Sequence, residues 1–256
     1  MSLEESSGGI QSVDRALIIL EYLADQGWST VGEIAEQLNV HKSTASRLLA
    51  TLANRGFVEQ EMDRGRYRLG LSIIQLAGSI QSELRLVSLA RPICKRLSES
   101  TQETVNISVL DQDEVINIDQ VLGTSSIVSI NWLGKRNPLT CTSTGKVLMA
   151  FLPLDEQKRL LKKPLSRCTK HSVLKFEVLE RQLSVIREEG YGYTLEELEL
   201  GLNAIAAPIY NTTQEVIAAL SISGPSYRLT KTRIPEMAKL TKEAAFEISE
   251  RLGYRV

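Results

Sequence analysis

Residues 30–70, TVGEIAEQLNVHKSTASRLLATLANRGFVEQEMDRGRYRLG, decide the fold of the N-terminal part of this chain. Apolar residues at helical spacings predict one helix that is capped by Thr30 and a second that begins near Lys42. Asn39 ends the first helix, because Asn tolerates the left-handed backbone that a tight turn requires. Two short helices joined by a three-residue turn are the helix-turn-helix layout of DNA-reading proteins.

The second predicted helix has a face that suits a DNA groove. Its apolar stripe leaves short polar side chains and one arginine on the opposite side. Arg47 can form two hydrogen bonds to a guanine edge, and the start of such a helix usually meets phosphates or base edges. The residues that we expect to contact DNA here are Lys42, Ser43, Thr44, Ser46 and Arg47. A helical hairpin with an ordinary solvated face is the alternative interpretation.

A basic hairpin is predicted directly after this helix. Gly56 is suited to end the helix, residues 57–58 begin a strand, residues 62–65 form a turn, and residues 66–69 return. Such a wing can lie along phosphates or in a minor groove. The wing residues that we expect to contact DNA are Arg64 and Arg66, with Arg68 beside them. A solvated hairpin edge blunted by charge is the alternative.

Charge is concentrated locally. The whole chain has 30 basic and 31 acidic residues and a formal net charge of −1, whereas residues 41–70 hold more basic than acidic side chains. We therefore expect sequence-selective binding through a dimer and not a strong general affinity for nucleic acid.

Composition restricts the other possibilities. A length of 256 residues with 43% hydrophobic and 24% charged residues is ordinary for a two-domain globular protein. The start, MSLEESSGG, is polar, and the sequence contains no run of 18 apolar residues, so we expect a cytoplasmic protein without a membrane span. Cys94, Cys141 and Cys168 are scattered and odd in number, which argues against a disulfide framework. Their spacing with two histidines supports no metal site, and we expect no cofactor.

Further elements flank the helix-turn-helix. Residues 12–26 are predicted to form a first helix, capped by Ser12, with a buried stripe of Val13, Ala16, Leu17, Leu20 and Leu23. Residues 71–86 are predicted to form a linker helix, which packs either on a second copy of itself or within one chain. The expected organisation is thus a DNA-binding domain over 1–70, a linker helix over 71–86 and a second domain over 87–256.

The second domain alternates strands and helices. Helices are predicted over 87–99, 143–152, 154–163, 175–190 and 234–252, and strands over 104–123 (a hairpin), 125–134, 191–195, 202–211 and 215–224. Pro92 is expected in the first turn of its helix. The fold class is therefore α+β, an antiparallel sheet with flanking helices.

The chain resembles the IclR family of bacterial transcriptional regulators over nearly its whole length. The resemblance rests on the winged helix-turn-helix and on three segments, NPLTCTSTGKVLMAFL (137–152), REEGYGYTLEELELGLNAIAAPIYN (187–211) and EVIAALSISGP (215–225). It implies that the second domain is a GAF-like effector domain that binds a small metabolite. It also implies dimers or tetramers that bind palindromic operators.

The resemblance also implies an effector site. Its residues are the helix start at Ser143, Thr144 and Gly145, which would hold a carboxylate, together with Thr194, Ala204, Ser221 and Ser223. Many members have an aspartate at position 194 and a cysteine at position 204, so the ligand here is expected to be larger or more apolar than a two-carbon acid. Trp132 and Leu133 would supply a wall, although a core tryptophan is the alternative. Cys141 is interpreted either as a buried core cysteine, the simpler hypothesis, or as a redox thiol. Lys146 is likewise either a surface lysine, the simpler hypothesis, or a partner of an anionic ligand. The acidic run at 196–199 is interpreted as a solvated or dimer-edge patch.

On this basis we expect the protein to be a ligand-responsive transcriptional repressor that binds double-stranded operator DNA. An enzyme of GAF-like fold that acts on a small molecule is the alternative. His171 and Cys141 are its only conceivable catalytic pair, and no local motif supports them. A helix pair that binds protein instead of DNA is a third possibility, against which the arginines of the wing argue.

Overall fold

The computed structural model describes residues 10–61, 65–78, 81–123 and 131–255. The chain divides into two compact units, residues 1–81 and 82–256, and the boundary falls inside the segment expected to link two domains. Each unit has its own hydrophobic core, and each is described by itself below.

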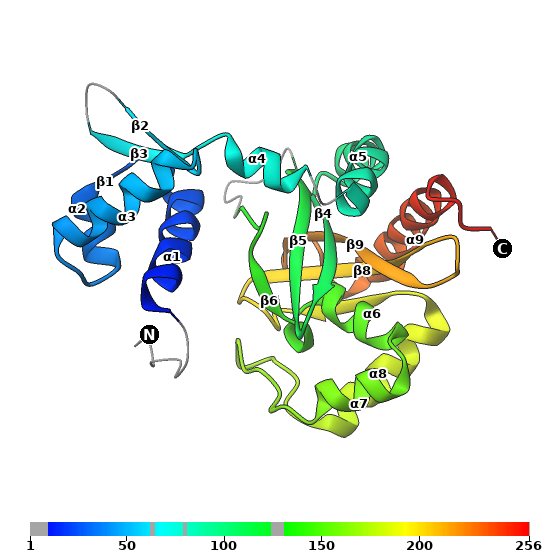
Figure 1. The fold of residues 1–256 in the computed structure, drawn as a ribbon. Coiled ribbons are helices and arrows are strands. Elements are labelled where there is room, and N and C mark those ends of the chain that lie inside the picture. The colour runs from blue at the N-terminus through cyan, green and yellow to red at the C-terminus, as the bar shows by residue number, and fades with distance from the viewer. Residues whose placement is uncertain (1–9, 62–64, 79–80, 124–130, 256) are drawn as a thin grey trace. The chain divides into compact units, whose positions relative to one another are not determined.

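The N-terminal unit is a winged helix-turn-helix (Figure 1). Its helices are α1 (Gln11–Gln26), α2 (Val31–Gln37) and α3 (Lys42–Asn54), and its strands are β1 (Ser29–Thr30), β2 (Val58–Gln60) and β3 (Arg66–Leu69). The sheet has the order β1-β3-β2, so the predicted hairpin gains a third, short strand. Thr30 caps α2 in a capping box with Glu33, and Asn39 adopts a positive φ of 50° in the turn before α3.

Helix α1 faces its core differently from the prediction. Ile19 and Leu23 are buried, but Val13 and Leu17 are each 54% exposed, and Ile10, not Ser12, holds the N-cap position. The reason is that α1 carries apolar side chains on two faces, and the face that contains Ile19 packs into the core beside α3 and β3. The predicted burial of Val13 and Leu17 was therefore wrong.

The predicted linker helix is not one helix. A short helix α4 (Ser72–Ala77) buries none of its residues, and α5 (Gln81–Thr101) begins six residues before the expected start. Pro92 consequently lies in the interior of α5 and not in its first turn. Leu86, Ala90, Ile93 and Leu97 are buried at spacings of four, three and four, which shows why the helix extends through the proline: one continuous apolar face anchors it.

The C-terminal unit is built on a six-stranded antiparallel sheet of order β6-β5-β4-β9-β8-β7. The strands are β4 (Thr104–Asp111), β5 (Glu114–Val121), β6 (Arg136–Pro138), β7 (Gly192–Leu195), β8 (Leu202–Tyr210) and β9 (Val216–Pro225). Strand β6 was expected to be loop. Of the strand predicted over 125–134, residues 125–130 lie outside the described residues, and residues 131–134 contribute only an isolated bridge between Leu133 and Asn117.

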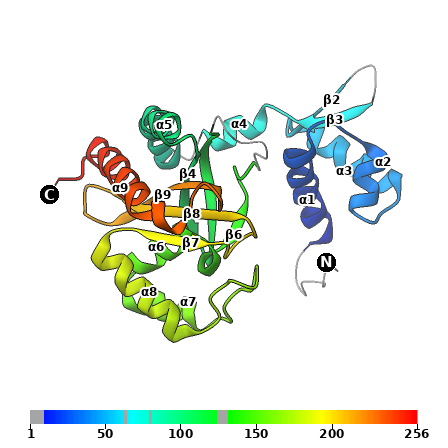
Figure 2. The same cartoon turned by 180° about the vertical axis from the view of Figure 1, so that it is seen from behind.

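Helices cover both faces of this sheet, as Figures 1 and 2 show. Helices α5 and α9 (Ile234–Arg251) share one core with β4, β8 and β9. On the other face, α6 (Ser143–Phe151), α7 (Leu154–Leu161) and α8 (Phe176–Glu189) share a second core with Val115, Ala206 and Ala219. Gly190 ends α8 with a positive φ of 73°, and Phe176, the first residue of the same helix, is exposed.

Candidate functional site

The outer face of α3 is open to solvent. Lys42, Ser43, Ser46 and Arg47 are exposed and Thr44 is half-buried, while Ala45, Leu49 and Leu52 lie in the core on the opposite side of the helix. The amphipathic arrangement predicted for this helix is confirmed by the burial pattern. It leaves a polar and basic helix face free to approach a groove.

The arginines of the wing are partly neutralised. Arg66 donates hydrogen bonds from Nε and from Nη2 to Glu61, at 2.8 and 3.2 Å, and Arg68 forms an ion pair with Glu59. Both guanidinium groups also lie over the Trp28 ring, at 5.8 and 4.7 Å from its centroid. Arg64 lies outside the described residues. The wing therefore presents less free positive charge than its sequence indicates.

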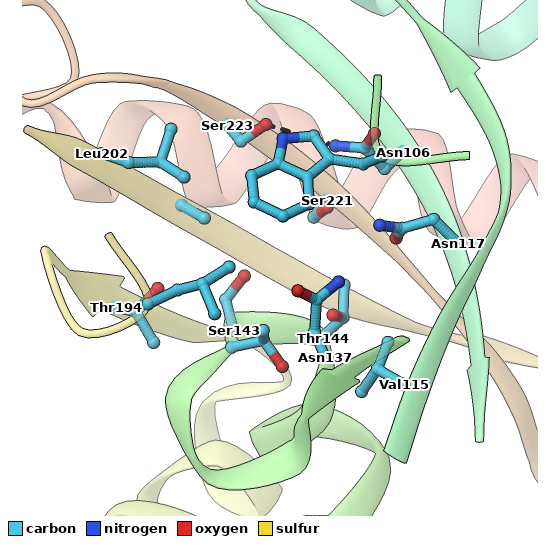
Figure 3. Close-up of a pocket in the computed structure, with 14 residues that line it drawn as sticks. Asn106, Val115, Asn117, Asn137, Ser143, Thr144, Thr194, Leu202, Ser221 and Ser223 are labelled. Carbon is cyan, nitrogen blue, oxygen red and sulfur yellow. Dashed lines mark hydrogen bonds between the residues drawn. The ribbon is translucent and has the colours of Figure 1, made fainter. Parts of the chain in front are cut away.

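A pocket opens between the sheet and the start of α6 (Figure 3). Its cavity volume is about 50 Å³, well below the roughly 300–1,000 Å³ of drug-sized ligand sites. The lining residues come from the sheet, from the start of α6 and from two loops: Asn106, Val115, Asn117, Trp132, Asn137, Thr142, Ser143, Thr144, Thr194, Leu198, Leu202, Ala204, Ser221 and Ser223. Among these described residues none is charged, and amides and hydroxyls predominate.

The start of α6 supplies hydrogen-bond donors to the pocket. Thr142 caps the helix, because its Oγ1 accepts the Gly145 N–H at 3.1 Å. The N–H groups of Ser143 and Thr144 precede the first intrahelical hydrogen bonds, so they are available to an acceptor. Gly145 itself does not line the pocket. A Cβ there would lie 2.2 Å from the Leu139 carbonyl oxygen, so this glycine serves the close approach of backbone to backbone.

Buried polar side chains face this helix from the sheet. The Asn106 Nδ2 donates to the Ser223 Oγ at 3.2 Å, and the register places Asn106 opposite Ser221 on the neighbouring strand β9. The Asn106 Oδ1 is buried and has no partner among the described residues. A buried acceptor without a donor is costly, so it marks a place where a ligand donor would be stabilising.

An ion pair lies one turn into α6, behind the pocket wall. The Lys146 Nζ is 2.7 and 2.6 Å from the two carboxylate oxygens of Glu197. Burial lowers the pKa of Lys146 and raises the pKa of Glu197, and their mutual attraction opposes both shifts. Lys146 is thus not a surface lysine, and Glu197 is not part of a solvated acidic run.

Several other predicted residues lie elsewhere. Leu133 is exposed and does not line the pocket, whereas Trp132, for which a core position was the alternative, does. The buried Cys141 has Cys168 as its sulfur neighbour, while the His171 Nε2 lies 3.6 Å from Glu196. In the described residues, histidines, cysteines and acidic side chains form no group of three that could hold a metal ion.

Comparison with known proteins identifies the family. The model of the bacterial transcriptional regulator IclR C-terminal domain matches residues 79–250, and that of the IclR helix-turn-helix domain matches residues 12–61. The chain belongs to the IclR family. It is 32% identical over 253 residues to the transcriptional regulator KdgR of Escherichia coli, which covers 98% of this chain and 96% of that protein. It is 34% identical over 252 residues to the transcriptional repressor IclR of the same organism, with 97% and 92% covered.

Solved structures of IclR proteins have the same fold. The Thermotoga maritima IclR structure matches with a TM-score of 0.79 and 32% identity, over 96% of this chain and all of that one. An IclR homologue of Microbacterium hydrocarbonoxydans, solved with 4-hydroxybenzoate, matches with a TM-score of 0.82 and 27% identity, over 95% and 98%. This chain is therefore a transcriptional regulator with an N-terminal DNA-binding domain and a C-terminal α+β domain. Among the described residues, none of the helices is both long and apolar enough to cross a bilayer.

The sequence did not reveal half of the pocket of this IclR protein. Asn106, Asn117 and Asn137 come from three strands, and only the register of those strands brings them together. The one available indication was a polar residue at an inward position of an otherwise apolar strand, as in TVNISVL (104–110).

Proposed function

We propose that this chain is a ligand-responsive repressor that binds a palindromic operator through α3 and the wing. A small organic acid in the pocket of the C-terminal unit modulates that binding. The protein works in the cytoplasm as a homodimer or homotetramer and catalyses no reaction of its own. The observation that carries the proposal is the exposed polar and basic face of α3, centred on Arg47.

The DNA half of the proposal is supported by the charge and exposure of α3. Arg47 projects from a helix whose other face is fixed in the core by Ala45 and Leu49, so it can approach a base edge without rearrangement of the fold. Lys42, Ser43, Thr44 and Ser46 lie at the start of the same helix, where phosphate contacts set the register. Arg66 of the wing can contact a phosphate when its ion pair with Glu61 opens.

The ligand half is supported by the pocket. The free N–H groups at the start of α6 suit a carboxylate, Ser221 and Ser223 offer hydroxyls, and the buried Asn106 Oδ1 lacks a donor. Thr194 and Ala204 lie opposite each other on β7 and β8 and leave that end of the pocket uncharged. The ligand class that fits is a small acid that also carries a hydroxyl group.

Self-association is supported by exposed apolar side chains in the N-terminal unit. Ile10, Val13 and Leu17 are exposed at the start of α1, and Leu71 and Ile74 are exposed at α4. Val13 and Leu17 are four positions apart and so lie on one face of α1, and a contiguous exposed apolar face is typical of a surface that a partner covers. A symmetric dimer would match the two half-sites of a palindrome.

The test is a binding measurement with selected DNA. Genomic fragments retained by the immobilised protein supply the operator, and mobility shifts then compare the wild-type chain with Arg47→Ala. Loss of one base-reading arginine should weaken operator binding by about 1–3 kcal/mol, which is roughly 5- to 150-fold. Arg181→Ala, the same change on α8 of the other unit, is the control. Equal operator affinity of Arg47→Ala and Arg181→Ala would refute the assignment of α3.

A further inference from the structure

Two cysteines that lie 27 positions apart in the sequence meet beside the pocket. The Cys168 Sγ is 2.8 Å from the Cys141 Sγ, and its S–H points to that sulfur. Cys141 is buried at the end of the 3-10 helix η1 (Leu139–Cys141), directly before Thr142, the cap of α6. Cys168 is exposed in the loop between α7 and α8. One thiol is therefore reachable from solvent and the other is held behind it.

The surroundings hold both sulfur atoms in place. The Ser172 Oγ accepts the N–H of Cys168 at 3.0 Å and donates to the Glu197 carbonyl oxygen at 2.8 Å. The Cys141 S–H donates to the Ser166 carbonyl oxygen at 3.3 Å. Hydrogen bonds from both sides thus keep the loop against the start of α6, so closing the pair to a bond length of about 2.05 Å requires only a small movement.

We propose that Cys141 and Cys168 are a redox site that forms a reversible intrachain disulfide with a small-molecule disulfide, such as oxidised glutathione, as the oxidant. The Cys168 thiolate attacks one sulfur of the oxidant, so that a mixed disulfide forms and one glutathione thiolate leaves. Cys141 loses its proton and attacks the Cys168 sulfur, which forms the Cys141–Cys168 bond and expels the second glutathione. The two thiols lose two electrons and two protons, and the oxidant becomes two molecules of reduced glutathione.

The bond would fix one wall of the pocket. It would join the loop of Cys168 to the residue that precedes Thr142, and Thr142, Ser143 and Thr144 line the pocket. Oxidation should therefore change the pocket environment. An effect of this change on effector binding rests on the proposed function. Formation of the disulfide is independent of the proposed function.

The test uses the full chain in buffers of defined ratio of reduced to oxidised glutathione, followed by alkylation and peptide mapping without reduction. The expected result is a linked pair of peptides that contain Cys141 and Cys168 and that separate when reduced glutathione is restored. Closure of a 27-residue loop should also raise the Tm of the oxidised protein by on the order of 10 °C. Cys94→Ala should keep the link, and Cys168→Ser, an exposed change that leaves the fold intact, should lose both the link and the Tm increase.

Two outcomes would overturn the redox site. One is a stable glutathione adduct on Cys168 with no transfer to Cys141, and the other is a disulfide between Cys168 residues of two chains. The effect on the pocket is read from Trp132, the only tryptophan left in a Trp28→Phe variant. Its emission should shift on oxidation, and an unchanged spectrum in a fully linked sample would refute the coupling to the pocket. No DNA or effector enters these measurements, so their failure is distinct from a failure of the proposed function.

Discussion

Lys146 of α6 and Glu197, which follows β7, form an ion pair with Nζ 2.6 Å from the nearer carboxylate oxygen, and the two side chains are only 1% and 9% exposed. Water solvates neither charge well, so each depends on the other. The pair joins the helix that closes the pocket to the segment that follows the edge strand of the sheet.

Loss of one member of this pair should be strongly destabilising. Glu197→Gln leaves a buried ammonium group without its counter-charge, and we expect a loss of about 3–5 kcal/mol in the free energy of unfolding. The double variant Lys146→Met with Glu197→Leu removes both charges and should recover most of that loss. Urea unfolding followed by circular dichroism measures both. If the free energy of unfolding of Glu197→Gln lay within about 1 kcal/mol of the wild-type value, the Lys146 ammonium group would not depend on Glu197 for its stability.

Gly145 should tolerate no side chain. A Cβ at this position would lie 2.2 Å from the Leu139 carbonyl oxygen, which is backbone and cannot move aside cheaply. Gly145→Ala should therefore cost about 1–3 kcal/mol and displace the start of α6. Gly32→Ala on α2 is the matched control, since its Cβ would meet nothing closer than 3.6 Å and alanine favours helices. Equal stability of the two variants in thermal unfolding would show that η1 and α6 are not in close contact.

The DNA-binding face and the pocket differ in how far the sequence predicts them. The outer face of α3 can be predicted from local periodicity, because the spacing of residues along a helix determines on which side each of them lies. Ala45 and Leu49 belong to a single apolar stripe, so only one face of this helix can pack on the core. The exposure of Val13 could not be predicted, because α1 offers two apolar faces and only tertiary packing chooses between them. The meeting of Asn106 with Ser221 depends on strands more than a hundred residues apart, and no local pattern contains that register.

Removal of a negative charge from the wing should strengthen DNA binding. Glu59 neutralises Arg68, so Glu59→Gln frees a guanidinium group for phosphate. We expect tighter binding to any duplex and a dependence of log K on log salt that is steeper by about 1, because one more counterion is released. The control is Glu188→Gln on α8, which removes the same charge from the other unit. A salt slope identical in both variants would mean that Arg68 does not reach the phosphates.

The pocket serines should determine the response to the effector. A thermal-shift screen of small hydroxy and keto acids should find compounds that raise the Tm of the wild-type protein, because a ligand that binds only the folded state stabilises it. In the double variant Ser221→Ala with Ser223→Ala, that increase should shrink or vanish, while operator binding without ligand is retained. Asn106→Leu should behave alike, since it removes the unpartnered acceptor. A compound whose Tm increase survives in both variants binds outside this pocket.

The reactivity of Cys168 should depend steeply on pH. Partial burial of the sulfur atom and the hydrogen bond to Cys141 raise the pKa of Cys168 to about 12, and only the thiolate reacts with iodoacetamide. Far below that pKa the thiolate fraction, and hence the alkylation rate, should rise about tenfold for each pH unit between pH 7 and pH 10, whereas an ordinary thiol levels off near its pKa of about 8.5. Cys141→Ala removes the hydrogen bond to Cys168 and should speed alkylation at pH 8. Peptide mapping of timed samples gives the rates, and a plateau near pH 9 in the wild-type protein would show that Cys168 is an ordinary surface thiol.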